Sequence, residues 1–191
     1  IESLDCLDQD INALKNDPQT VLQLGHFFYY QFKTPIKTLQ KQFYILDAYY
    51  SMASAMQHYG FNFPEWVDQP SPMIEFEEAV HPLVTNAIGN QLSLSASKRF
   101  LFLTGANMAG KSTFIKTVGI LAYLAHIGMG VPAKKCKLTL LDGLITNLTT
   151  ADNVLKGESY FFNEVQRIKN TVERIKDGKK YFVLIDELFK G

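Results

Sequence analysis

Apolar residues along the chain follow two different periods, which change near residue 62. Over residues 1–62 they recur mostly at intervals of three and four, which is helical spacing. The clearest series comprises Ile36, Leu39, Phe43, Leu46, Tyr50 and Ala53. Pro18 and Pro35 interrupt this stretch, so the pattern predicts two or three helices. Three prolines between Asn62 and Pro72 cannot continue a helix, and they predict a linker or an extended arm.

From Met73 onward, strands alternate with helices. Met73–Glu77 alternates apolar with acidic residues, which predicts a half-exposed strand. Further strands are predicted at 92–94, 100–103, 136–141, 144–147 and 181–185. Helices are predicted at 111–128 and 159–176. This alternation indicates an α/β fold with a largely parallel sheet. We therefore expect a helical segment 1–62, a linker 63–72 and an α/β domain 73–191.

The composition is that of an ordinary soluble globular protein. Of 191 residues, 47% are hydrophobic, and the 19 Lys plus Arg residues equal the 19 Asp plus Glu residues. This balance gives no global electrostatic reason to expect nucleic acid or a membrane as a partner. No run reaches the roughly 18 apolar residues of a membrane helix. Cys6 and Cys136 lack metal-ligand spacing, which favours unpaired thiols and a cytoplasmic location.

The most specific motif lies at residues 105–113, where a glycine and four further residues precede Gly-Lys-Ser. It reads Gly105-Ala106-Asn107-Met108-Ala109-Gly110-Lys111-Ser112-Thr113. An apolar run enters it and the predicted helix leaves it, which is the context of a phosphate-binding loop. The backbone N–H groups of the loop would bind phosphate oxygens. Lys111 would reach the β- and γ-phosphates of a nucleotide, and Ser112 would hold Mg²⁺.

The second motif is the apolar strand 181–185 followed by Asp186 and Glu187. Its carboxylates would emerge at the C-terminal edge of the sheet, where the phosphate loop also lies. Asp186 would organise Mg²⁺ through its water shell, and Glu187 would orient or deprotonate the attacking water. Such a pair could simply close a core strand at the surface, but its place downstream of the loop favours the functional interpretation. A second carboxylate suits activation of water, and therefore favours hydrolysis of the nucleotide over transfer of its phosphoryl group to an acceptor.

Four weaker signals have structural interpretations beside the functional ones. Ser159 lies at the predicted start of a helix, where an N-cap and a functional role are equally supported. The aromatic run 26–30 could stack on bases. No basic residue interleaves with it, which favours a helical core or a contact with another domain. His126 is interpreted as a packing residue, and the lysines at 134–137 as a solvated loop.

Taken in order, these residues resemble the MutS family of DNA mismatch repair ATPases. The matching segments are His81-Pro82, the loop 105–113, Gly130-Val131-Pro132-Ala133, Ala151-Asp152, 157–164 and Asp186-Glu187. Asn107-Met108 is the most discriminating part, because a generic phosphate loop leaves those positions free. The match runs from about Met73 to Gly191, and 45–53 resembles the end of the family's lever helix. Ala106 and Ala109 stand where the family usually has proline and glycine.

The resemblance implies a P-loop NTPase fold of the ABC and MutS type, with a partial sheet, flanking helices and a preceding helical segment. It implies ATP and Mg²⁺ as ligands, bound by the loop with Ser112 and Asp186 on the metal, and Lys111 and Glu187 as catalytic residues. It also implies a homodimer in which Ser159 completes the partner's site, and a clamp that grips double-stranded DNA according to the ATP state. Because the chain stops five residues beyond Asp186, we expect a fragment that binds ATP and turns it over poorly.

Two alternatives stay open. Another P-loop ATPase, of the transporter or chromosome-maintenance type, would carry a long helical insertion between the two motifs or a Ser-Gly-Gly signature, and the sequence shows neither. A structural module could instead hold a nucleotide without turnover, although Lys111, Ser112, Asp186 and Glu187 are all intact. No aromatic residue lies near Ala87, where the family's repair members stack on adenine, so the contacts to the base are unassigned.

Overall fold

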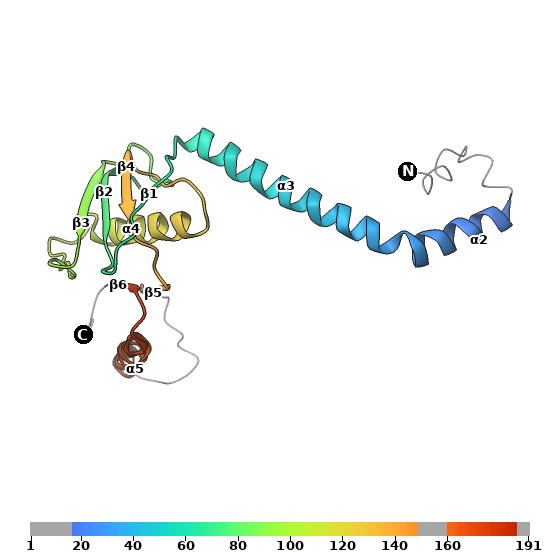
Figure 1. Ribbon diagram of the computed structural model, residues 1–191. Coiled ribbons are helices and arrows are strands. Elements are labelled where there is room, and N and C mark those ends of the chain that lie inside the picture. Colours follow the sequence, from blue (N-terminus) through green and yellow to red (C-terminus); the bar gives the residue numbers. More distant parts are fainter. Residues whose placement is uncertain (1–16, 149–159, 187–191) are drawn as a thin grey trace. The chain divides into compact units, whose positions relative to one another are not determined.

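The chain forms two compact units in a computed structural model, which describes residues 17–148 and 160–186 (Figure 1). The first unit extends to Ala53 and the second begins at Ser54. The domain bounds expected from the sequence, 1–62, 63–72 and 73–191, stay a prediction. Within the described residues, no helix is both long enough and apolar enough to cross a membrane.

Helices α2 (Pro18–His26) and α3 (Lys33–Tyr59), with the π-helix η2 (Phe27–Gln31) between them, follow one another along the N-terminal part of the chain. Both prolines lie where a helix tolerates them. Pro18 is the first residue of α2, and Asp17 caps this helix by accepting from Gln19 N at 3.1 Å and Thr20 N at 3.3 Å. Pro35 lies in the first turn of α3, where a missing N–H breaks no helical hydrogen bond. The described part of this stretch contains two α-helices, in agreement with the predicted two or three.

The aromatic run 26–30 builds a cluster on the helix surface. The π-helical register places residues five apart along the same side, and the rings of Phe27 and Phe32 stack with centroids 5.5 Å apart. Tyr29 and Tyr30 are 61% and 70% exposed. No described residue of α2, η2 or α3 is buried. The run therefore forms no core with the described part of the chain.

The second unit contains a four-stranded sheet in the order β1-β4-β2-β3. Its strands are β1 (Glu65–Trp66), β2 (Ile74–Ala79), β3 (Asn90–Leu94) and β4 (Lys135–Leu138). Only β1 and β4 run parallel, whereas β2 is antiparallel to both β3 and β4. The expectation of a largely parallel sheet is wrong here. The connection from β2 to β3 contains no crossover helix, which parallel neighbours would need.

A separate two-stranded sheet pairs β5 (Gly143–Asn147) with β6 (Tyr181–Ile185) in parallel. The connection between them includes α5 (Tyr160–Arg174) and the short 3-10 helix η4 (Ile175–Asp177). This strand-helix-strand unit agrees with the predicted alternation of elements. The mixed α/β character is thus confirmed, whereas a complete P-loop fold stays a prediction.

The core of the second unit forms around α4 (Lys111–His126), which begins directly after the phosphate loop (Figure 1). Its buried residues are Thr117, Val118, Leu121, Ala122 and Ala125. They cluster with Phe76 of β2, Leu138 of β4 and Leu184 of β6, so α4 contacts both sheets. The alternation predicted for β2 is confirmed, because Ile74 and Phe76 are buried and the acidic residues between and after them are exposed.

The apolar run 100–103 is not a strand, which corrects the prediction. A strand needs a hydrogen-bonded neighbour, and neither sheet pairs with this run in the part of the chain that the structure describes. Phe100 and Phe102 are accordingly 80% and 72% exposed. The composition of the run favours a strand, but composition does not supply a partner.

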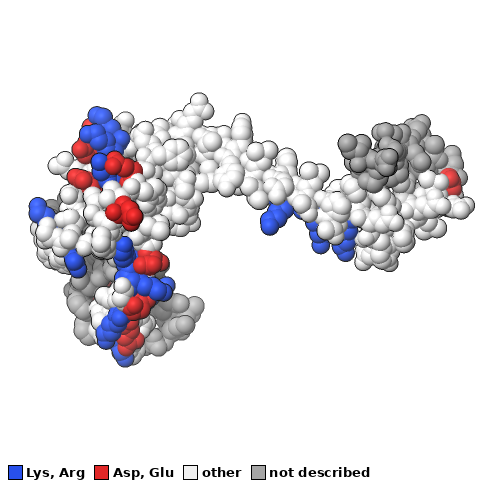
Figure 2. Space-filling model, in the orientation of Figure 1, with Lys and Arg blue, Asp and Glu red and all other residues white. Residues whose placement is uncertain are grey.

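Three ion pairs connect the exposed side chains of β4 and the residue before it with β1 and β2, where acidic and basic side chains gather in Figure 2. Lys137 contacts Glu65 at 2.8 Å, and Lys135 contacts Glu77 at 2.9 Å. The hydrogen bond from Lys135 lowers the pKa of Glu77. The lysines at 135 and 137 thus lie on β4 rather than in the solvated loop expected from the sequence. Because water screens these pairs, they favour the observed register more than they stabilise the fold.

The segment after α4 is held at two points. Asn62 N donates to Val131 O at 3.1 Å, Val131 N donates to Asn62 O at 2.8 Å, and Asn62 Nδ2 donates to Ala133 O at 3.0 Å. His126 bonds Ala122 O through Nδ1 at 2.6 Å and accepts from Leu141 N through Nε2 at 3.0 Å. Its ring meets the edge of Trp66 with centroids 5.3 Å apart. His126 is therefore a packing residue, as predicted, that also ties α4 to the loop before β5.

The buried thiol of Cys136 offers a test of this core. Burial raises the pKa of Cys136 to about 12, because the thiolate would lose its hydration. In a Cys6→Ser variant, we expect the folded protein to react with a thiol reagent at pH 8 roughly a thousandfold more slowly than the denatured chain. Equal rates in the two states would show that β4 does not bury this side chain.

The same group predicts a pH dependence of stability. The folded-state pKa lies above the unfolded value of about 8.5. The contribution of Cys136 is therefore fully present below that pH and is lost as the pH rises toward about 12. In urea titrations from pH 8 to 10.5, the free energy of unfolding should fall more steeply for the unmodified chain than for Cys136→Ala. Parallel pH profiles for the two proteins would contradict a raised pKa of Cys136 in the folded state.

Candidate nucleotide-binding site

The position of the candidate phosphate loop is set by the packing of α4. Gly119, in the middle of this helix, faces β6 so closely that a Cβ there would lie 2.8 Å from Leu184 Cδ1. Phe114, in the first turn, places its ring 6.5 Å from that of Phe76 on β2. Because both contacts are made by the helix that begins at Lys111, the packing of α4 also positions the end of the loop.

The backbone of the loop turns through left-handed conformations. Gly110 has φ 86° and is the N-cap of α4, and Met108 has φ 64°. A glycine takes a positive φ at little cost, whereas a residue with a Cβ does not. Ala106 and Ala109, which replace the usual proline and glycine, do not take a positive φ. Ala109 N donates to Ala106 O at 3.3 Å and closes the turn. Alanine is thus compatible with the loop at both positions.

Lys111 lies across the loop that precedes it. Its Nζ donates to Gly105 O at 2.8 Å and to Ala106 O at 2.7 Å. An ammonium group has three donors, so one N–H stays available to a ligand oxygen. The first turn of α4 contains no acidic residue. The lysine charge and the positive end of the helix dipole therefore act together on an anion bound at the loop.

The remaining predicted residues of the motif occupy the loop and the first turn of α4. Residues 105–110 are exposed, and Ser112 is half-buried beside Lys111. Thr113 is exposed and its carbonyl accepts from the hydroxyl of the buried Thr117 at 2.8 Å. The loop is thus open to solvent along its length, as a phosphate-binding segment must be.

The carboxyl ends of β5 and β6 form the second part of the candidate site. Asp186 follows β6, and its N–H donates to Asn147 O at 3.0 Å, which extends the parallel ladder. Asp186 is half-buried, and within the described residues its carboxylate makes no hydrogen bond or ion pair. Glu187 and Ser159 lie outside the described residues.

Two residues at this edge were missed by the sequence analysis. Asn147 Nδ2 donates to Thr171 Oγ1 at 2.9 Å, and that hydroxyl donates to Arg167 O at 2.9 Å. These bonds attach α5 to the sheet edge beside Asp186. Asn147 could have been found, because it ends a predicted strand at the edge where ligands of α/β sheets bind. Thr171 lies within a predicted helix and carried no such signal.

The donor set suits Mg²⁺. A serine hydroxyl and an aspartate carboxylate are hard oxygen ligands, and Mg²⁺ is usually held by one or two carboxylates together with phosphate oxygens and water. No group of three or more His, Cys, Asp or Glu side chains converges in the part of the chain that the structure describes. Ser112 lies in the first turn of α4, Asp186 directly follows β6, and α4 packs on β6 where Gly119 faces Leu184.

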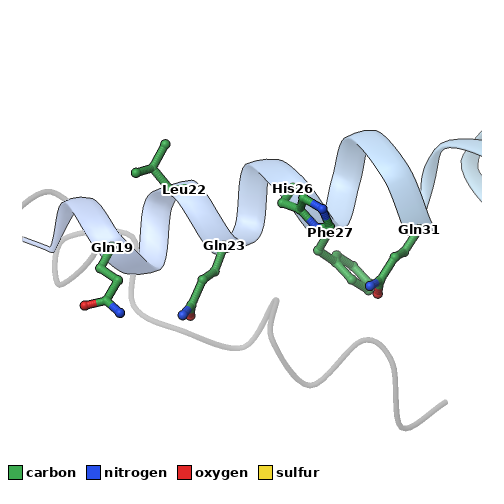
Figure 3. Close-up of a pocket in the computed structure, with 6 residues that line it drawn as sticks. All are labelled: Gln19, Leu22, Gln23, His26, Phe27 and Gln31. Carbon is green, nitrogen blue, oxygen red and sulfur yellow. The ribbon is translucent and has the colours of Figure 1, made fainter.

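A shallow groove of about 470 Å³ follows one face of α2 and η2 (Figure 3). It is lined by Gln19, Leu22, Gln23, His26, Phe27 and Gln31. None of these residues belongs to the phosphate loop or to the edge of β6, and the groove lies in the first unit. The candidate site therefore rests on the loop and not on this groove.

Comparison with known proteins identifies a matching family and a relative. A family model described as MutS domain V matches residues 101–191. The chain is similar to the DNA mismatch repair protein MutS of Petrotoga mobilis (strain DSM 10674 / SJ95), with 33% identity over 165 residues. This alignment covers 84% of the chain and 20% of the relative. The chain thus spans about a fifth of the length of that relative.

Gly110 tests the loop conformation. A Gly110→Ala exchange should destabilise the protein by about 1–2 kcal/mol, because a Cβ is strained at a left-handed φ. Gly110→Asn is the matched control, since asparagine tolerates this conformation better. Urea unfolding of both variants measures the difference. If alanine is tolerated at least as well as asparagine, Gly110 does not have a positive φ in the folded protein.

Proposed function

The chain belongs to the MutS family, and from this premise we propose that it binds and hydrolyses ATP as part of a MutS-like DNA mismatch repair protein. The observation that carries the proposal is the position of Lys111, which lies across the loop and has one donor left for a phosphate oxygen. ATPase activity is general in this family, and the match to MutS domain V includes the loop and both carboxylates.

The phosphate groups are bound by the start of α4. The first N–H groups of an α-helix have no intrahelical acceptor, so those that follow Gly110 are available to phosphate oxygens. Lys111 neutralises charge on the β- and γ-phosphates while its bonds to Gly105 O and Ala106 O hold the side chain in place. This preorganisation is favourable because the cost of ordering a long side chain is met before ATP arrives.

Hydrolysis requires residues at the edge of β6. Ser112 and Asp186 would hold Mg²⁺, directly or through its water shell, and the metal supplies charge neutralisation to the phosphates. Glu187 would orient or deprotonate the attacking water, and Ser159 would complete the site of a partner subunit. The role of Glu187 comes from the motif and that of Ser159 from the resemblance to the family, since both residues lie outside the described part of the chain.

The proposal extends to coupling between ATP and DNA. Helix α4 begins at the loop, and the segment that follows it is hydrogen-bonded through Val131 and Ala133 to Asn62, just beyond the end of α3. We propose that a change at the loop reaches the helical segment through α4 and these hydrogen bonds. In the whole protein we propose a cytoplasmic homodimer whose ATP state controls its grip on double-stranded, mismatched DNA.

Lys111→Ala tests the nucleotide site. Loss of a charge-assisted contact costs about 1.5–3 kcal/mol, so affinity for ATP with Mg²⁺ should fall by at least about tenfold in calorimetric titration. Lys116→Ala is the matched control, since Lys116 lies on the same helix, is exposed and is not part of the loop. It should bind ATP like the unmodified chain.

Phosphate release, measured on the same proteins, distinguishes an ATPase from a structural module that only binds ATP. Turnover that is lost in Lys111→Ala and kept in Lys116→Ala supports an ATPase. Binding without turnover, also in a longer chain that includes the flanking sequence, would favour a structural module that holds ATP as a fixed ligand. Unchanged binding in Lys111→Ala would contradict the site itself.

A further inference from the structure

Asn147 joins the residue that follows β6 to helix α5. It is the last residue of β5, and it is paired with Ile185, the last residue of β6. Its main-chain carbonyl accepts from Asp186 N at 3.0 Å, and its side-chain Nδ2 donates to Thr171 Oγ1 at 2.9 Å. One residue therefore connects the backbone of Asp186, the candidate metal-side carboxylate, to a helix.

The hydrogen bonds of Thr171 fix the direction of the Asn147 amide. Thr171 is only 7% exposed, so its hydroxyl has little access to water. A hydroxyl group has a single O–H, and that of Thr171 donates to Arg167 O, one turn earlier in α5, at 2.9 Å. The hydroxyl oxygen is left to accept, which requires the NH2 group of Asn147 on this side. A rotated amide would place Oδ1 against a hydroxyl that has no proton left to donate, so a single orientation is favoured.

The end of the β5–β6 sheet needs such a support because this sheet has two strands in the described residues. Two paired strands alone are marginally stable in water, and they gain stability by packing against helices. Successive side chains of a strand point to opposite faces, so Leu184 lies on one face and the pair of Ile185 with Asn147 on the other. Leu184 faces Gly119 of α4, whereas Asn147 is bonded to α5. The two helices thus hold the carboxyl end of the sheet from both faces.

We propose that Asn147 is a positioning residue for the candidate metal site, and that it acts on Asp186 through the backbone. Its bond to α5 fixes the end of β5, and its carbonyl fixes the N–H of Asp186, so the carboxylate keeps one position. The inference rests on the proposed function, because the position of Asp186 matters only if Mg²⁺ accompanies ATP. Asn147 should therefore affect the part of the ATP affinity that depends on Mg²⁺, and not the part that depends on Lys111.

Calorimetric titration of the 191-residue chain with ATP, once with Mg²⁺ and once with EDTA, tests the positioning role. The ratio of the two affinities, which we call the metal ratio, measures the contribution of Mg²⁺ to binding. In Asn147→Ala we expect the metal ratio to fall by about three- to tenfold, the range that one hydrogen bond contributes. The affinity in EDTA should stay within about twofold of that of the unmodified chain. An unchanged metal ratio would overturn the inference.

Thr171 provides a second route to the same bond. Thr171→Val removes the hydroxyl with little change of volume, so it should lower the metal ratio as Asn147→Ala does. The double variant Asn147→Ala/Thr171→Val should fall no further, because both changes remove the same hydrogen bond. Thr171→Ser keeps the hydroxyl and should retain the original metal ratio. Equal ratios in Thr171→Val and Thr171→Ser would show that the hydroxyl has no such role and would overturn the inference.

The matched control is Tyr181→Phe, which removes a hydrogen bond at the other end of the same strand. Tyr181 Oη donates to Asp177 Oδ2 at 2.8 Å and so links the start of β6 to η4, which directly follows α5. This variant should keep the metal ratio of the unmodified chain. Urea unfolding without nucleotide verifies that each variant is folded and measures its loss of stability. A metal ratio that falls as far in Tyr181→Phe as in Asn147→Ala would reveal a general loosening of the sheet and would overturn the positioning role.

Asp186→Asn separates this inference from the proposed function on which it rests. If Asp186 binds the metal or its water shell, this exchange lowers the metal ratio at least as far as Asn147→Ala does. A lowered ratio in Asp186→Asn together with an unchanged one in Asn147→Ala overturns the positioning role alone. An unchanged ratio in Asp186→Asn overturns the metal role of this carboxylate, and with it any action of Asn147 through Asp186.

Discussion

The contact on which the second unit depends is the burial of the apolar face of α4. This helix contributes Val118 and Leu121 to a cluster that also contains Phe76, Leu138 and Leu184, so one element joins the four-stranded sheet to the β5-β6 pair. Gly119 permits the close approach to β6. Because α4 begins at Lys111, the same packing that builds the core also positions the candidate phosphate loop.

The C-terminal end of α4 is also held by tertiary contacts. His126 bonds the loop that leads to β5, and the segment after the helix is paired with Asn62, just beyond the end of α3. The two ends of α4 therefore lie at the candidate phosphate loop and beside the segment that pairs with Asn62. A stiff helix held at both ends can transmit a small displacement, because packed cores shift between discrete arrangements rather than deforming continuously.

Apolar patterning was a good guide to the elements and a poor one to their partners. The alternation in β2 and the apolar run of β6 correctly predicted strands, since each has a neighbour to pair with. The run 100–103 has the same character, yet it pairs with neither sheet in the described residues.

The sequence by itself determined two local features, the start of α4 after Gly110 and the start of α2 at Pro18. These depend on residues within a few positions of one another. Tertiary structure alone decided the antiparallel order of β2, β3 and β4, the parallel pairing of β1 with β4, and the bonds of Asn147 and His126. Such contacts join residues far apart in the chain, and their register depends on which surfaces meet, which a local period does not encode.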